Sequence, residues 1–139
     1  RGMNEPAESL FYWKKILDAD PDNKVILTRI GDSYRQMGEL DTAREFYSKA
    51  LNIEFDSYAV LGLALINKEK GNYAEAIESL SGLLVNDAKN PRLYVEIAQC
   101  WASLDKRDKA LEVLTRGLRM GIKNLGISEM LEKLQKQIQ

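Results

Sequence analysis

The stretch GNYAEAIESL, residues 71–80, decides the fold of this chain because its pattern occurs three times. Similar stretches are GELDTAREFY at 38–47 and DKRDKALEVL at 105–114. Three sets of landmark residues share the same two spacings, 33 and 34 residues: Ala43, Ala76 and Ala110; Gly38, Gly71 and Asp105; Leu51, Leu84 and Leu118. A period of this length is typical of proteins that stack small helical units.

Each unit carries the pattern of two helices. Apolar residues recur at i, i+3, i+4 and i+7, which is the spacing of an amphipathic helix. In the first complete unit one helix is expected to end at Gly38, with Asp41 as the N-cap of the next. Glycine inside a helix costs about 1 kcal/mol relative to alanine, so Gly31 indicates a steric demand at that position. By their spacing four aromatic side chains are predicted to be core residues: Tyr34, Tyr47, Tyr94 and Trp101.

This pattern resembles the tetratricopeptide repeat, whose signature is W-x2-L-G-x2-Y followed by A-x3-F. The three units carry Leu27-x2-Ile30-Gly31-x2-Tyr34 with Ala43-x3-Tyr47, Val60-x2-Leu63-Ala64-x2-Asn67 with Ala76-x3-Leu80, and Tyr94-x2-Ile97-Ala98-x2-Trp101 with Ala110-x3-Leu114. The resemblance implies an all-α fold, an α-solenoid of antiparallel helix pairs that forms a right-handed superhelix. The prediction is a single domain, 1–139. It begins with a half repeat at 7–21 that has only the second helix of a unit. Three full repeats follow at 24–56, 57–90 and 91–124, and a C-terminal capping helix lies at 127–138.

Composition and charge exclude several classes of function. The chain has 139 residues, 45% of them hydrophobic and 29% charged, with a formal net charge of -1. This balance is typical of a globular protein, and the lack of a basic surplus argues against nucleic-acid binding, although an RNA-binding helical repeat stays as an alternative. With no histidine, a single Cys100 and no glycine-rich phosphate loop, we expect no enzyme, no cofactor and no metal site.

No apolar run approaches the roughly 20 residues that span a bilayer, so no membrane insertion is expected. The first residues, Arg1-Gly2-Met3, are unlike a natural start and indicate a trimmed chain or a fragment. The compartment is therefore not determined: the single cysteine favours the cytoplasm, and removal of a targeting segment stays open.

The resemblance implies that the first helix of each unit lines a concave groove that binds a partner peptide or helix. The groove positions carried over to this chain are Arg29, Asp32, Arg35, Gln36, Tyr58, Leu61, Leu65, Lys68, Glu69, Arg92, Glu96 and Gln99. Among them Tyr58, Leu61 and Leu65 are expected to form an apolar island near arginines, a composition typical of binding hot spots. The alternative is a set of ordinary solvated side chains, with neighbouring repeats covering the two leucines. We therefore predict a scaffold or adaptor that is part of a larger protein or assembly.

Two departures from the family pattern affect this prediction. The subclass that grips chaperone C-terminal tails uses Lys, Asn and Arg at five inward positions, which hold Thr28, Asp32, Gly62, Arg92 and Glu96 in this chain. The two acidic side chains would repel a terminal carboxylate, so chaperone-tail binding is not expected. In addition, Glu54-Phe55 stands where the family has Asp-Pro at the end of a repeat.

Phe11 is the anomaly of the N-terminal half repeat. The equivalent positions hold Glu45, Glu78 and Glu112. One interpretation is that Phe11 contacts either upstream sequence or a second copy of the chain, which makes homo-oligomerisation through the terminal helices an alternative function. The other interpretation is a singly exposed aromatic at a frayed end.

Overall fold

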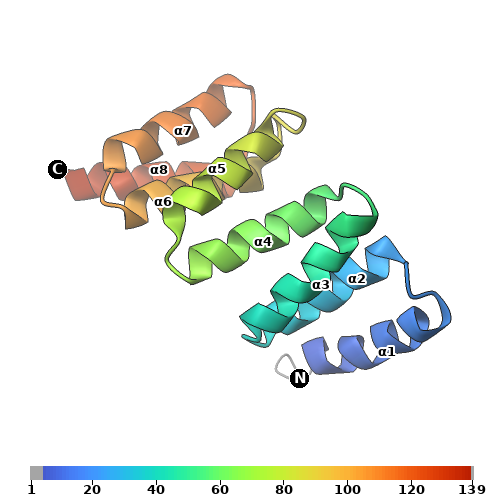
Figure 1. Ribbon diagram of the computed structural model, residues 1–139. Coiled ribbons are helices and arrows are strands. Elements are labelled where there is room, and N and C mark those ends of the chain that lie inside the picture. Colours follow the sequence, from blue (N-terminus) through green and yellow to red (C-terminus); the bar gives the residue numbers. More distant parts are fainter. Residues whose placement is uncertain (1–4, 139) are drawn as a thin grey trace. The chain divides into compact units, whose positions relative to one another are not determined.

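The computed structural model describes residues 5–138, and in that range it contains helices and no strand (Figure 1). The all-α helical-repeat fold predicted from the sequence is confirmed. The helices are α1 (Glu5–Ala19), α2 (Lys24–Gln36), α3 (Leu40–Ile53), α4 (Ser57–Glu69), α5 (Tyr73–Leu84), α6 (Pro91–Ser103), α7 (Arg107–Arg119) and α8 (Leu125–Ile138). The chain forms two compact units, Arg1–Ile66 (unit 1) and Asn67–Gln139 (unit 2), and the division falls inside α4.

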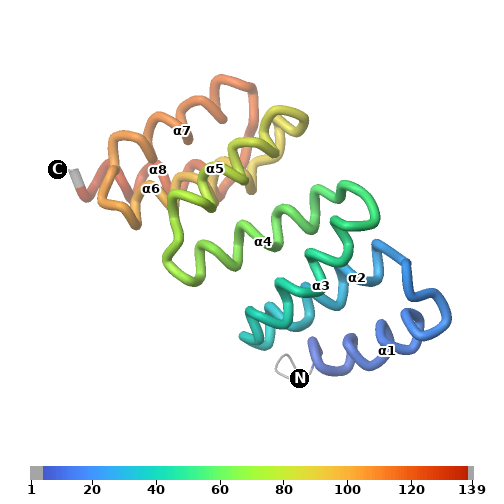
Figure 2. The backbone as a smooth tube through the Cα atoms, in the orientation of Figure 1, coloured from blue at the N-terminus to red at the C-terminus, as the bar shows by residue number. Residues whose placement is uncertain are grey.

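The turns between paired helices share one geometry, which the trace in Figure 2 shows at α2–α3 and α6–α7. Gly38 and Gly71 have φ near +82° and +83°, and Asp105 takes the same left-handed conformation with φ 60°. Such a residue at a helix end lets the chain reverse at once. At the first turn the amide of Glu39 donates to the carbonyl of Tyr34 at 2.9 Å.

This tight turn corrects one expectation about α3. The helix begins at Leu40 with Glu39 as its cap residue, and the cap side chain makes no capping hydrogen bond. Asp41 therefore lies inside the first turn of the helix instead of capping it. The reversal at Gly38 leaves no room for a longer connection, so the helix starts earlier than the side-chain pattern indicated.

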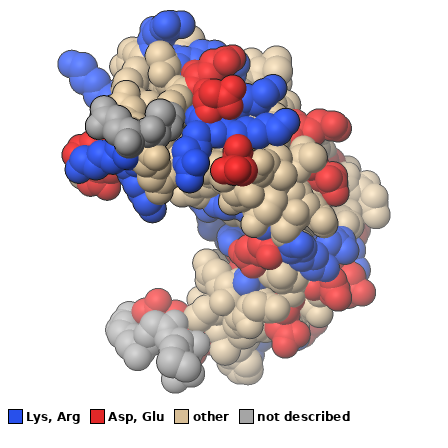
Figure 3. All heavy atoms as spheres, turned by 90° about the vertical axis from the view of Figure 1, so that its left-hand side faces the viewer, with Lys and Arg blue, Asp and Glu red and all other residues tan. Residues whose placement is uncertain are grey.

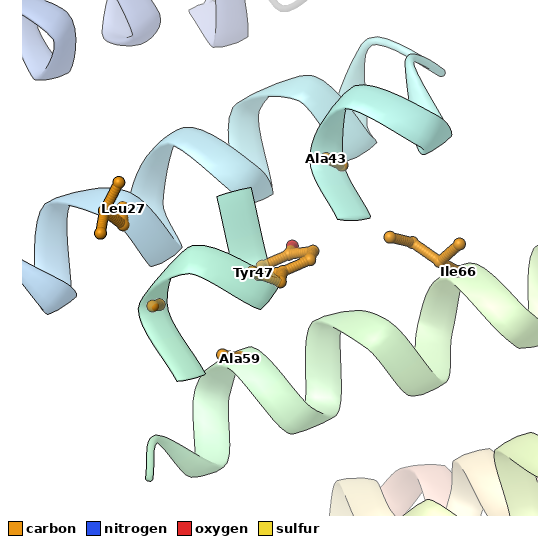
Figure 4. Packing of buried hydrophobic residues seen from close by; sticks show 6 residues of the cluster. Leu27, Ala43, Tyr47, Ala59 and Ile66 are labelled. Carbon is orange, nitrogen blue, oxygen red and sulfur yellow. The ribbon is translucent and has the colours of Figure 1, made fainter. Parts of the chain in front are cut away.

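The core of unit 1 is centred on Tyr47 of α3 (Figure 4). Its ring has no exposed surface and points from α3 into the space between α2 and α4. A Cβ atom on Gly31 of α2 would lie 2.8 Å from the ring, and one on Gly62 of α4 would lie 2.2 Å from it. Only glycine fits at these two positions, because real Cβ atoms do not approach other heavy atoms so closely. The steric demand predicted at Gly31 is thus confirmed, and its cause is an aromatic ring.

Unit 2 packs in a similar way around Tyr94 of α6. The ring is buried, and its hydroxyl donates to the carbonyl of Ala88 at 2.6 Å. Gly117 of α7 faces this ring, and a Cβ atom added there would lie 3.2 Å from it. Helix α8 packs on α6 and α7 and buries Ile127 and Leu134.

Gly62→Ala should lower the free energy of unfolding of unit 1 by about 1–3 kcal/mol, the usual cost of overpacking a core. The new methyl group meets the Tyr47 ring, which Gly31 confines from the other side. Gly82→Ala in α5 is the matched control, because nothing lies within 4 Å of its Cβ position. In the control the better helix propensity of alanine should raise stability by about 0.5–1 kcal/mol. Urea unfolding checks both, and a Gly62→Ala protein as stable as wild type would refute the packing argument.

Candidate functional site

A cleft of about 470 Å³ opens in unit 1 between α2 and the start of α4. We call it the α2–α4 cleft. Three of the groove residues predicted from the sequence meet there: Arg29, Asp32 and Tyr58. The remaining lining residues are Lys24, Val25, Thr28, Phe55, Asp56 and Ser57.

The base of the α2–α4 cleft is held by the buried carboxylate of Asp56. One of its oxygens accepts a hydrogen bond from the Thr28 hydroxyl at 2.8 Å. The other accepts from the amide of Tyr58 at 2.9 Å, so Asp56 caps the N-terminus of α4. Because both oxygens have partners, this carboxylate fixes the start of α4 against α2.

The rim of the cleft is apolar and exposed. Tyr58 is 73% exposed and Phe55 is 68% exposed, and Val25 on α2 is also open to water. Phe55 was missed as a site residue because it belongs to the junction between repeats. The available signal was the replacement of the usual Asp-Pro by Glu54-Phe55.

The cations of the cleft differ in how they are paired. Lys24 forms an ion pair with Glu54 at 2.6 Å, and this pairing raises the pKa of Lys24 and lowers that of Glu54. Lys24 also donates to the carbonyl of Phe55 at 3.3 Å. Arg29 is exposed and, within residues 5–138, makes no hydrogen bond or ion pair. Arg29 is therefore the cation of the cleft that is free to meet a ligand.

Two other predicted groove residues hold the core tyrosine. The hydroxyl of Tyr47 donates to Asp32 at 2.5 Å and accepts from Nε of Arg35 at 3.2 Å. Burial, followed by the hydrogen bond to Asp32, raises the pKa of the Tyr47 phenol above its ordinary value. Asp32 and Arg35 thus have a structural partner, which spacing along the chain did not indicate. Gln36, the last residue of α2, is exposed.

The predicted apolar island is reduced to one exposed side chain. Leu65 is 5% exposed and belongs to the core, so the expectation that it faces a partner is wrong. Leu61 is half-buried. Burying a leucine removes apolar surface from water and stabilises the fold by about 1.5–3 kcal/mol, which explains why it packs inward.

Unit 2 gathers the remaining predicted groove charges into one network. Lys68 donates to Glu96 at 2.7 Å and also to the side-chain oxygen of Gln99. Arg92 lies 3.7 Å from the second oxygen of Glu96. Glu69 is exposed beside this network. The neighbouring Cys100 is fully buried, and burial raises the pKa of its thiol.

Phe11 lies on the open side of α1 and is 58% exposed. Its ring meets Tyr12 edge-on, with centroids 5.8 Å apart, and the amine of Lys15 lies 4.5 Å from its centroid. A shallow hollow here is lined by Ala7, Glu8, Phe11 and Tyr12. Contact of Phe11 with a second copy stays a prediction at this point.

Other kinds of site are not evident in the described part of the chain. Between residues 5 and 138 no three His, Cys, Asp or Glu side chains are grouped to hold a metal ion. In the same range no helix is both long and apolar enough to cross a bilayer. Figure 3 shows one face of the molecule, on which basic and acidic side chains are interspersed.

Known proteins resemble this chain in sequence and fold. Residues 26–57 match the family model described as a tetratricopeptide repeat. The chain is 27% identical over 135 residues to anaphase-promoting complex subunit 7 of Arabidopsis thaliana, and the match covers 94% of this chain and 24% of that protein.

Two solved structures share the fold. MamA 41-end from Desulfovibrio magneticus RS-1 gives a TM-score of 0.79 at 15% identity, over 95% of this chain and 75% of that one. PcrH from Pseudomonas aeruginosa has been solved in complex with the chaperone binding region of PopD. That complex gives a TM-score of 0.69 at 21% identity, over 81% of this chain and 91% of that one. The chain thus spans about a quarter of the length of the plant relative, and the structural likeness concerns the fold.

Tyr47→Phe should make the stability of unit 1 less sensitive to alkaline pH. An unfolded tyrosine ionises near pH 10, whereas the raised pKa keeps folded Tyr47 protonated. Its contribution is therefore complete below about pH 10 and is lost as pH rises further, by up to about 1.4 kcal/mol per pH unit.

Urea unfolding of wild type and Tyr47→Phe between about pH 9 and pH 12 measures this difference, since the two proteins differ only in the Tyr47 hydroxyl. Tyr58→Phe, which removes an exposed hydroxyl from the same unit, is the control. Parallel pH profiles for wild type and Tyr47→Phe would contradict the expected role of the buried phenol.

Proposed function

Because the chain is a tetratricopeptide-repeat protein, we propose that it is a protein-interaction module that holds a partner segment in the α2–α4 cleft. The observation that carries this proposal is the pairing of two exposed aromatic side chains with an unpaired arginine at one cleft. Phe55 and Tyr58 are more than two-thirds exposed, and Arg29 has no partner within residues 5–138. Exposed aromatic and arginine side chains are the residues most often found at the centre of binding sites.

The apolar rim of the cleft favours a partner that inserts a large apolar side chain. Val25, Phe55 and Tyr58 leave a hollow whose base is the satisfied carboxylate of Asp56. Inserting an apolar side chain here would remove surface from water on both partners without breaking a hydrogen bond at the base. An anchor of this type needs only a short extended or helical segment.

The charges of the cleft favour a partner that carries an acidic residue next to its apolar anchor. Lys24 and Asp32 already have partners, with Glu54 and Tyr47 respectively. Arg29 can therefore form a new charge-assisted hydrogen bond, and a carboxylate is its natural acceptor. The partner segment that fits best has a large apolar residue beside Asp or Glu.

The likeness to other proteins supports the same class of function. PcrH, which shares the fold, was solved with a bound region of another protein, PopD. The plant relative is named as a subunit of a complex, and it is much longer than this chain. We therefore propose that this chain acts as a scaffold or adaptor within a larger protein or assembly, without chemistry of its own.

Selection of a random peptide library displayed on phage, against the immobilised chain, tests this function. The wild type should enrich peptides with a large apolar residue next to Asp or Glu. Tyr58→Ser should weaken binding of the enriched peptides by at least about tenfold, the usual effect of truncating an aromatic anchor. Arg29→Glu should shift the selection towards basic peptides.

Val85→Ser is the control for this experiment, because it removes another strongly exposed apolar side chain that is not among the cleft residues. It should leave peptide binding unchanged. The proposal fails if the wild type enriches no peptide. It also fails if the enriched peptides bind Tyr58→Ser as tightly as wild type.

A further inference from the structure

Helix α1 has an exposed stripe that its contact with α2 does not use. The residues of α1 that are half-buried include Leu10, Trp13 and Leu17. On the opposite side Glu8, Phe11, Tyr12 and Lys15 are exposed. Their spacing of i, i+3, i+4 and i+7 places them on one helix face, which we call the α1 stripe.

The centre of the α1 stripe is apolar and its ends are charged. Phe11 and Tyr12 are 58% and 63% exposed, and they contact each other edge-on. Glu8 precedes them by about one turn and Lys15 follows them by about one turn. Neither charge has an ion-pair partner among the residues that the structure describes.

A further helix of the repeat type does not account for the whole stripe. In α3 the residue equivalent to Tyr12 is Phe46, and its ring stacks on Tyr34 of α2 with centroids 5.5 Å apart. The residue equivalent to Phe11 is Glu45, which stays exposed although α2 covers its neighbour. A helix placed before α1 in the same manner would therefore cover Tyr12 and leave Phe11 in water.

The charge pattern of the stripe is complementary to itself when reversed. Glu8 and Lys15 are equidistant from the midpoint between Phe11 and Tyr12 in the sequence. When two copies of α1 lie antiparallel about a two-fold axis, each Glu8 meets Lys15 of the other copy, and each Phe11 meets the other Tyr12. In a parallel pair the like charges would meet instead.

From this symmetry we propose that α1 is a homodimerisation surface, on which a second copy of the chain packs its own α1 antiparallel. The two ion pairs close both ends of an aromatic centre, and they set the direction of pairing. This surface is separate from the α2–α4 cleft, so dimerisation and partner binding do not depend on the same residues. Since a contact between two short helices is smaller than a standard interface, the dimer is expected to be weak.

Sedimentation equilibrium of the whole chain from about 10 µM to about 1 mM measures this association. Wild type should show a monomer–dimer equilibrium in this range. Phe11→Glu should be monomeric and should keep the helical content and stability of wild type, because the equivalent positions of the other repeats hold glutamate.

Charge exchange tests the antiparallel geometry. Glu8→Lys and Lys15→Glu should each weaken the dimer by about tenfold, since each places like charges opposite each other twice. The double variant Glu8→Lys/Lys15→Glu should recover the wild-type dissociation constant. Mixing the two single variants should also give a dimer, because one variant then carries lysine at both stripe ends and the other carries glutamate at both.

The proposal is overturned if wild type stays monomeric up to about 1 mM. It is also overturned if Phe11→Glu dimerises as wild type does, or if neither the double variant nor the mixture recovers the dimer that the single variants lose. If wild type is a monomer, Tyr12 is the surface that a further helix of the repeat type would cover. Phe11 is then a solvent-exposed side chain, as the equivalent residues of the other repeats are.

Discussion

The ring of Tyr47 lies between a glycine of α2 and a glycine of α4. Gly31 of α2 and Gly62 of α4 each leave the space that a Cβ atom would fill, so the ring packs against backbone on both sides. This sandwich brings α2, α3 and α4 together and sets the distance between the first helices of neighbouring repeats. The α2–α4 cleft exists because these two helices are held at that distance over a tyrosine.

The same tyrosine decides which charges of the groove remain available. Its hydroxyl engages Asp32 and Arg35, and the ion pair with Glu54 engages Lys24. Arg29 is left without a partner in the described residues. Core packing and recognition are therefore coupled, because a side chain that satisfies a buried hydroxyl offers less to a ligand.

The residues proposed to act in recognition are the ones that do not repeat. Phe55 stands at a repeat junction where the family has proline, and Phe11 stands where the other repeats have glutamate. Both are exposed aromatic side chains. Repeated positions are constrained by stacking, whereas departures from the repeat are free to provide contact surface.

The sequence by itself determined the period, the helix pairs, the turns at Gly38 and Gly71 and the steric demand at Gly31, because these follow from local spacing and backbone conformation. Aromatic spacing placed Tyr47 and Tyr94 in the core, yet Tyr34 and Trp101 are only half-buried and lie under lysine amines. Only the tertiary structure decided that Leu65 is covered, that Gly62 faces a ring, and that the charges around Arg29 are already paired. Those outcomes depend on how helices rotate against one another, and a pattern along one helix does not contain its neighbour's side chains.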